Sequence, residues 1–186
     1  NIVINGGHEL YGEIEVSGMK NAAVAVILSC LLVKDTCTLE NLPNISDVRA
    51  SFDILESMGA VVKRLSPTTI QVDCTRCKCG TSPYELVRKM RASYYLLGAL
   101  LGKYKRAEVA LPGGCNIGSR PIDQHLKGFR ALGADVDIQY GKIIAEADRL
   151  VGKHIYFDVV SVGATINVMM AAAMADGNTV IENVAK

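Results

Sequence analysis

The stretch AAVAVILSCLLV, residues Ala22–Val33, is apolar on every side when it is drawn as a helix. Such a helix is buried all round, because a helix at a surface keeps one polar face. Ser17-Gly18 precedes the stretch and supplies a helix cap. The stretch is shorter than the roughly 20 residues that a membrane span needs. The sequence therefore predicts a helix at the centre of a globular core.

The pattern around this helix returns twice along the chain. Apolar helices are expected at 22–33, 94–101 and 166–175. Amphipathic helices are expected at 44–58 and 121–132, each ending before a Gly-Ala pair. Short half-polar strands are expected at 2–4, 11–16, 36–42, 60–65, 69–73, 108–111, 135–139, 142–146, 154–157 and 178–184. Self-similarity at about seventy residues is typical of a fold built from one repeated unit.

The repeats predict an α/β (α+β) fold with its helices inside. The apolar helices pack together in the centre, and the strands form sheets around them with one face in water. The repeats cover about 18–74, 75–147 and 148–186, and the third is incomplete because the chain ends before its amphipathic helix. We therefore expect one domain over 18–186.

A glycine-rich segment, LPGGCNIGSRP at Leu111–Pro121, is the first candidate for function. Its glycines let the backbone approach a ligand closely, and Pro121 suits the first position of a helix. Cys115 is expected among free backbone N–H groups, a helix start and Arg120, in a field that favours anions and lowers the thiol pKa. An inert buried cysteine is the alternative, but the glycines and Arg120 favour a functional one.

The starts of the apolar helices are the second candidate. Lys20-Asn21, Arg91 and Ser161–Gly163 occupy the same place in their repeats. If the helices are parallel, three helix N-termini gather on one side, and their unpaired N–H groups attract anions. Ordinary solvated charge is the alternative, although the helix dipole disfavours a cation at a helix start.

The composition excludes several classes of partner. The net charge of +1 over 186 residues, with few aromatic residues and no Trp, disfavours nucleic acid and membrane surfaces. Six cysteines are too few for a secreted disulfide scaffold, and no signal peptide is recognisable, so a cytoplasmic location is expected. No cofactor is expected.

The cluster CTRCKC, with Cys74, Cys77 and Cys79, raises the question of a metal ion. Three thiolates need a fourth ligand, and no further Cys or His lies close by in the sequence. We therefore predict no metal site and favour a surface turn between strands.

Four motifs resemble the UDP-N-acetylglucosamine enolpyruvyltransferases (UDP-N-acetylglucosamine 1-carboxyvinyltransferases). They are SGMKNAA at 17–23, KMRAS at 89–93, LPGGCNIGSRPID at 111–123 and SVGAT at 161–165. The resemblance runs along the whole chain and covers about the first half of the family enzyme. It implies two domains, each an inside-out α/β barrel of three βαβαββ units, with the active site between them. It also implies that residues 1–17 form strands that pack with the second domain.

The resemblance further implies roles for single residues. Cys115 matches the general acid, which adds covalently to phosphoenolpyruvate and is alkylated by fosfomycin. Phosphoenolpyruvate and cleft contacts are implied for Lys20, Asn21 and Arg91, with Lys20 also catalytic. Contacts to uridine and diphosphate are implied for Arg120, Pro121, Ile122, Asp123, Gln124, Val160, Ser161, Val162 and Gly163. Val159 departs from the family, since many members have a lysine there.

The implied reaction transfers enolpyruvyl from phosphoenolpyruvate to the 3-hydroxyl of UDP-N-acetylglucosamine and releases phosphate, the first committed step of peptidoglycan synthesis. The family's base-like aspartate and several arginines belong to the second domain, so this half is expected to fold but to be inactive alone. The related shikimate-pathway transferase is one alternative. A non-catalytic module that binds a nucleotide sugar is another.

Overall fold

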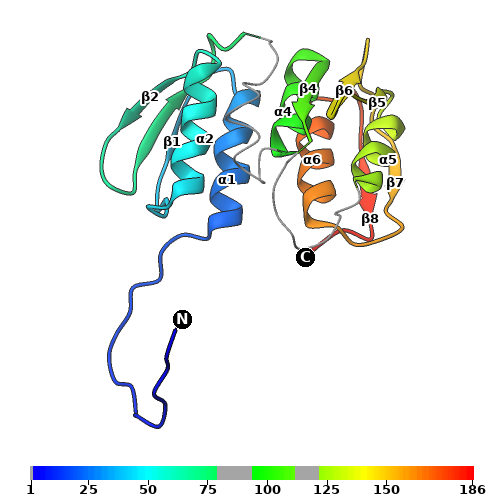
Figure 1. Cartoon of the computed structure of the whole chain (residues 1–186). Helices are drawn as coiled ribbons and strands as arrows, with labels where there is room; N and C mark the ends of the chain where they lie inside the picture. The colour runs from blue at the N-terminus through cyan, green and yellow to red at the C-terminus, as the bar shows by residue number, and fades with distance from the viewer. Residues whose placement is uncertain (1, 79–93, 112–121) are drawn as a thin grey trace.

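The computed structural model describes residues 2–78, 94–111 and 122–186. The helices are α1 (Lys20–Ser29), continued by the 3-10 helix η1 (Cys30–Leu32), α2 (Ser46–Ser57), α4 (Tyr95–Tyr104), α5 (Asp123–Ala131) and α6 (Val162–Ala172). The strands are β1 (Thr36–Leu39), β2 (Val61–Arg64), β3 (Ile70–Asp73), β4 (Arg106–Ala110), β5 (Asp135–Gln139), β6 (Lys142–Glu146), β7 (His154–Tyr156) and β8 (Val180–Glu182). Every helix and strand expected after residue 18 is present, with ends that differ by a few residues (Figure 1).

The three apolar helices α1, α4 and α6 lie side by side and are parallel. A Cβ atom on Gly98 of α4 would lie 2.2 Å from the carbonyl oxygen of Asn167 in α6. One turn later, a Cβ on Gly102 would lie 3.1 Å from the Met170 oxygen and 3.2 Å from Leu32 of η1. The contacts advance in the same direction along α4 and α6, and the C-terminal end of the first apolar helix joins them at Gly102. The N-termini therefore lie together at the opposite end.

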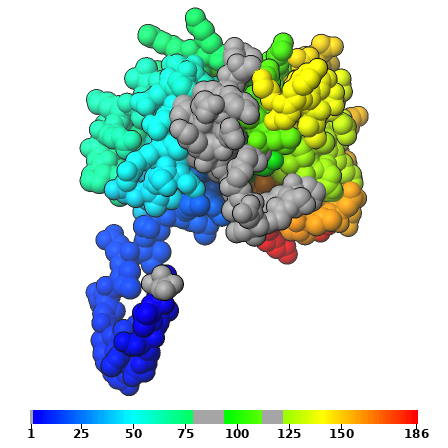
Figure 2. All heavy atoms as spheres, viewed as in Figure 1, coloured from blue at the N-terminus to red at the C-terminus, as the bar shows by residue number. Residues whose placement is uncertain are grey.

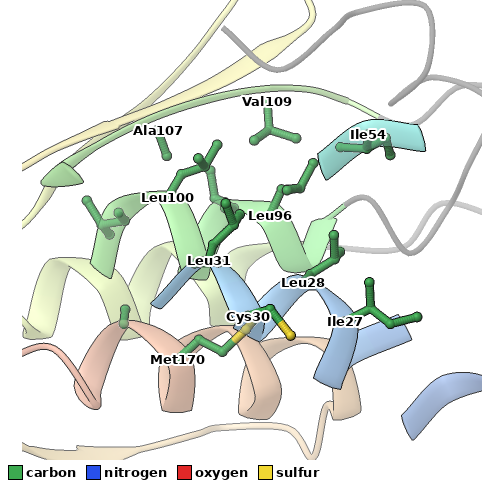
Figure 3. Close-up of a cluster of buried hydrophobic side chains, with 14 of the residues drawn as sticks. Ile27, Leu28, Cys30, Leu31, Ile54, Leu96, Leu100, Ala107, Val109 and Met170 are labelled. Atoms are coloured by element: carbon green, nitrogen blue, oxygen red, sulfur yellow. The ribbon is translucent and has the colours of Figure 1, made fainter. Parts of the chain in front are cut away.

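The core sits between these helices and the strands that cover them. Figure 3 shows Ile27 and Leu31 on the first helix, Leu96 and Leu100 on α4, and Val109 on β4, all without measurable exposure. The amphipathic helices pack outside, α2 against α1 and α5 against α6. Each turns a fully or almost fully buried phenylalanine inward, Phe52 or Phe129. Burial of this kind stabilises a fold by roughly 1.5–3 kcal/mol for each large apolar side chain.

The sheets follow the repeats. β1-β3-β2 and β4-β6-β5 are antiparallel sheets with the same strand order, and β7 pairs with β8 in parallel. The middle strand of each antiparallel sheet alternates between buried and partly exposed residues, as one-sided packing requires. The prediction of inner helices with outer sheets is therefore confirmed. The described strands form three separate sheets and no closed barrel.

The strands expected at 2–4 and 11–16 are wrong for this chain. Residues 2–18 contain no strand and leave the body of the molecule as an extended arm (Figures 1 and 2). Their apolar side chains are almost fully exposed, including Ile4, Leu10 and Ile14. An alternating sequence becomes a strand only where a second strand accepts its backbone hydrogen bonds, and the described part of this chain offers none. Packing of the arm with a second domain stays a prediction.

Candidate active site

Lys20 is the first residue of α1 and stands at the end where the inner helices begin. Its ammonium nitrogen lies 2.7 Å from a carboxylate oxygen of Asp47, in the first turn of α2. A cation at a helix start is disfavoured by the helix dipole, and Asp47 offsets that cost. Lys20 and Asn21 are both exposed, so each side chain is accessible to a ligand.

Ser161 caps α6 at the same end of the molecule. Its hydroxyl oxygen accepts a hydrogen bond from the Ala164 N–H at 3.3 Å, and its carbonyl oxygen accepts one from the Thr165 hydroxyl at 2.8 Å. The helix therefore starts at Val162, within Ser161–Gly163, which the sequence places at the start of this inner helix. Val162 is exposed and Gly163 has no side chain. The first N–H groups of a helix have no partner within it, so this turn is suited to an anion.

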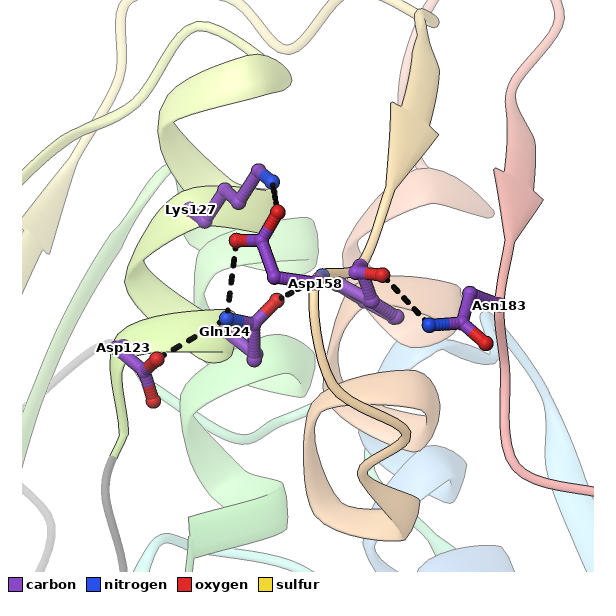
Figure 4. Close-up of polar contacts among 6 residues, drawn as sticks. Asp123, Gln124, Lys127, Asp158 and Asn183 are labelled. Carbon is purple, nitrogen blue, oxygen red and sulfur yellow. Dashed lines mark hydrogen bonds and ion pairs between the residues drawn. The ribbon is translucent and has the colours of Figure 1, made fainter.

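Gln124 connects the start of α5 to the loop before α6 (Figure 4). Its amide oxygen accepts the Asp158 backbone N–H at 2.9 Å, and its amide nitrogen donates to the Asp158 carboxylate at 3.3 Å and to Asp123 at 3.0 Å. The Lys127 ammonium also binds the Asp158 carboxylate, at 2.7 Å. Hydrogen bonds from Lys127 and Gln124 lower the pKa of Asp158. The carboxylate therefore stays ionised and holds α5 to this loop.

The two expected nucleotide-sugar segments are brought close by this contact. Ile122, Asp123 and Gln124 open α5, while Val160–Gly163 follow Asp158 by two residues. On the far side of Asp158, the Asn183 amide donates to the Phe157 carbonyl oxygen at 2.8 Å (Figure 4). Because Asn183 directly follows β8, this bond holds the loop to the end of that strand. Gln124 is buried, so within this chain its side chain joins the two segments and is not part of an open surface.

His125 lies in the first turn of α5, beside the start of α6, and was not among the residues predicted from the sequence. It is 6% exposed, its ring centre lies 5.9 Å from that of Tyr94, and its Nε2 would lie 3.0 Å from a Cβ atom on Gly163. Burial lowers the pKa of His125 to about 4, against a smaller opposing effect of Asp123. Among the described residues, no group hydrogen-bonds its Nδ1. The available signal was helical spacing, since His125 and the buried Phe129 share one face of α5.

Arg91, Cys115, Arg120 and Pro121 lie outside the described residues. Their placement and roles stay predictions. Of the glycine-rich segment, only Leu111 is described, and its N–H donates to the Gly141 carbonyl oxygen at 2.8 Å. The next described residue is Ile122. The structure thus joins the α5 start to the loop before α6, and it places Lys20 at the same end of the inner helices.

The cysteine cluster is buried rather than superficial. Cys74 and Cys77 lie in a turn, as expected, but Cys74 is fully buried and Cys77 is 7% exposed. Cys79 lies outside the described residues. Within the described ranges, no group of three or more His, Cys, Asp or Glu side chains could hold a metal ion. In the same ranges, no helix has the length and apolar character that crossing a bilayer requires.

Comparison with known proteins identifies the family. The family model of EPSP synthase (3-phosphoshikimate 1-carboxyvinyltransferase) matches residues 4–186. A UDP-N-acetylglucosamine 1-carboxyvinyltransferase of Clostridium botulinum is 58% identical over 98% of this chain, and UDP-N-acetylglucosamine 1-carboxyvinyltransferase 2 of Clostridium acetobutylicum is 50% identical over 100%. The chain spans 44% of the length of each of these relatives.

Solved structures show the same fold at low sequence identity. The enolpyruvyl transferase NikO from Streptomyces tendae superposes with a TM-score of 0.79 at 23% identity, over 95% of this chain and 42% of that protein. EPSP synthase from Acinetobacter baumannii gives a TM-score of 0.73 at 16% identity, over 91% of this chain and 40% of that protein. With its repeated units, its inner helices and the family model that matches residues 4–186, the chain belongs to the EPSP synthase family.

Proposed function

We propose that this chain is the Cys115-bearing half of an enzyme that transfers enolpyruvyl from phosphoenolpyruvate to the 3-hydroxyl of UDP-N-acetylglucosamine and releases phosphate. The reaction is the first committed step of peptidoglycan synthesis. The names of relatives at 50–58% identity support this acceptor over shikimate 3-phosphate. The structural observation that carries the proposal is the common end of the parallel inner helices, where Lys20 and the cap of α6 lie.

That end of the molecule suits the charges of the proposed substrates. Phosphoenolpyruvate has a carboxylate and a phosphate, which require cations and oriented N–H donors. Lys20 supplies a cation that Asp47 holds at 2.7 Å. A bound substrate anion would share the Lys20 ammonium with Asp47 or replace Asp47 as its partner. Because Lys20 is exposed, binding does not require this ammonium to leave a buried position.

The nucleotide sugar is assigned to the starts of α5 and α6. The N–H groups of the α6 start favour a diphosphate, and the contact between Gln124 and Asp158 holds the two segments together. Val159 is exposed, and it replaces a lysine that many members of the resembled family have. We therefore expect this protein to bind the diphosphate with one cation fewer at this position.

In the proposed chemistry, the Cys115 thiol donates a proton to the methylene carbon of phosphoenolpyruvate while the sugar hydroxyl oxygen attacks the adjacent carbon. Phosphate then leaves that carbon, and the methyl carbon loses a proton to give the enol ether. A thiol with a pKa near the working pH can act as this acid. The second domain of the complete protein would supply the base, so we expect no turnover by this half alone.

The setting of the protein follows from the same proposal. Its partners are the two substrates and the second domain, with no nucleic acid or membrane involved. Cys30, Cys37, Cys74 and Cys77 are free thiols, which is typical of a reducing compartment, and this supports a cytoplasmic location.

Calorimetric titration of UDP-N-acetylglucosamine into this chain and into the full-length protein tests the proposal. We expect saturable heat in the full-length protein, and its loss in the Arg120→Ala variant. Arg149→Ala is the matched control, because Arg149 is an exposed arginine paired with Asp176, which follows the C-terminal end of α6, opposite the helix starts. Shikimate 3-phosphate should give no heat.

The outcomes separate the alternatives. Heat with shikimate 3-phosphate but not with the nucleotide sugar would overturn the assigned acceptor. Binding of the nucleotide sugar without phosphate release by the full-length protein would instead identify a non-catalytic module.

A further inference from the structure

Four cysteines, three from the first repeat and Cys77 just after it, lie near the C-terminal ends of α1 and α4. Cys30 belongs to η1, Cys37 to β1, and Cys74 and Cys77 to the turn after β3. They lie away from the helix starts that form the candidate active site, since the turn contacts Lys103 and Tyr104 at the opposite end of α4. Nothing in the proposed reaction uses these thiols.

Cys74 and Cys77 have the backbone geometry of a disulfide pair. The Cys77 N–H donates to the Cys74 carbonyl oxygen at 3.2 Å, which closes a β-turn with Thr75 and Arg76 at its corners. The ends of a β-turn lie within about 7 Å of each other, and disulfide-bonded Cα atoms are separated by about 4.4–6.8 Å. The turn therefore holds the two Cα atoms within about the range that a disulfide bond spans.

The sulfur atoms already contact each other. The Cys74 thiol donates a hydrogen bond to the Cys77 sulfur, which raises the pKa of Cys74 and lowers the pKa of Cys77. The nearby Lys103 ammonium also lowers the pKa of Cys77. Cys77 is thus the better nucleophile and Cys74 the resolving thiol.

Three hydrogen bonds, two from α4 and one to the end of α2, hold the turn in place. The Lys103 ammonium donates to the Cys74 carbonyl oxygen at 2.9 Å, and the Tyr104 hydroxyl donates to the Cys77 carbonyl oxygen at 2.7 Å. The Lys78 N–H donates to the Met58 oxygen at 3.2 Å, behind α2. Cys77 is 7% exposed, so a small oxidant reaches it more readily than a protein does.

The neighbouring pair, Cys30 and Cys37, is poorly suited to nucleophilic attack. Burial, together with the adjacent Cys37, raises the pKa of Cys30 to about 12, and its thiol donates to the Val26 carbonyl oxygen at 3.5 Å. Cys30 therefore contributes almost no thiolate at neutral pH.

We propose that Cys74 and Cys77 form a peroxide-sensitive dithiol that closes to an intramolecular disulfide. The Cys77 thiolate attacks one oxygen of hydrogen peroxide, breaks the O–O bond and becomes a sulfenic acid, while hydroxide leaves. The Cys74 sulfur then attacks the Cys77 sulfur, its proton goes to the departing hydroxyl, and water leaves. The two thiols lose two electrons and two protons, and the peroxide is reduced to two molecules of water.

Peptide mapping after mild treatment of the chain with hydrogen peroxide tests this inference. The sample is then denatured in the presence of the alkylating reagent and digested with trypsin, which cuts after Arg64, Arg76 and Lys78 and so separates the two cysteines. We expect the peptide 65–76 to remain joined to the dipeptide 77–78, and dithiothreitol to release them. Cys74→Ser should abolish the link, whereas Cys30→Ser, the removal of another buried thiol, should leave it.

Two results would overturn the inference. One is a link from Cys74 to Cys30 or Cys37 in place of Cys77. The other is recovery of both peptides fully alkylated from a sample in which another cysteine has been oxidised.

The role of Lys103 gives a second readout. Lys103→Met should slow formation of the link about threefold for each unit by which the pKa of Cys77 rises, because the thiolate fraction falls faster than its nucleophilicity grows. Lys103→Arg keeps the charge and should retain the rate. Lys103 lowers the pKa of both thiols, so equal rates in all three proteins would refute activation of the attacking thiolate by the Lys103 charge.

Discussion

At the scale of single residues, His125 links the candidate site to the stability of the fold. Its folded pKa of about 4 lies below its usual value of 6.5, so the folded chain binds fewer protons than the unfolded chain between these values. Stability from the neutral ring is therefore present above pH 6.5 and is lost as the pH falls toward 4. The full difference amounts to about 3 kcal/mol.

Urea unfolding at pH 7 and pH 4.5 measures this effect. We expect the native chain to lose more free energy of unfolding between the two pH values than the His125→Gln variant does. Equal losses would show that the buried ring does not titrate with the fold. The sequence could not reveal this shift, because the ring is enclosed by Tyr94 at the start of α4 and Gly163 in α6, which are far from His125 in the sequence.

At the scale of elements, the contact between α4 and α6 depends on glycine. A Cβ atom on Gly98 would lie 2.2 Å from the Asn167 carbonyl oxygen, a backbone atom that cannot rotate away. The Gly98 N–H also donates to the Asn167 side-chain oxygen at 2.8 Å, in a fully buried position. We expect Gly98→Ala to destabilise the chain by about 3 kcal/mol, even though alanine favours helices, because the two helices must move apart.

Thermal unfolding followed by circular dichroism checks this prediction. Gly6→Ala is the control, since a Cβ at Gly6 meets no atom within 4 Å, and its effect should stay within about 0.5 kcal/mol. A Gly98→Ala protein as stable as the control would contradict the close approach of the two helices.

Element prediction from the sequence succeeded where burial leaves a local pattern. The helices α1, α4 and α6 are apolar all round, and β5 and β6 were predicted to the residue. The start of α6 at Val162 lies within Ser161–Gly163, the segment predicted to form the start of this inner helix, and the Ser161 side chain caps it. Site contacts such as Gln124–Asp158 join residues 34 positions apart, and no local pattern encodes that distance.

At the scale of the whole molecule, the arm of residues 2–18 contributes little to the folded body. Its large apolar side chains, such as Ile2 and Leu10, are more than 90% exposed. We expect deletion of residues 2–17 to change the melting temperature of this chain by no more than about 2 °C, because hardly any buried contact is removed. Differential scanning calorimetry measures the change.

A fall of more than about 5 °C would mean that the arm packs on the body in solution. The same deletion in the full-length protein should lower the melting temperature, since the arm is predicted there to pair with the second domain. The sequence assigned the strands of the arm to packing with the second domain, which lies outside this chain, so that packing stays a prediction.

The parallel arrangement of the inner helices also makes the molecule electrically polar. Helix dipoles that point the same way repel one another side by side, whereas antiparallel neighbours attract. At the C-terminal pole, the Lys105 ammonium donates to the carbonyl oxygens of Gly102 at 2.7 Å and Met174 at 3.3 Å, and so neutralises the ends of two helices at once. An anion at the N-terminal pole would complete this neutralisation. Binding an anion at the site would therefore also stabilise the packing of the parallel inner helices.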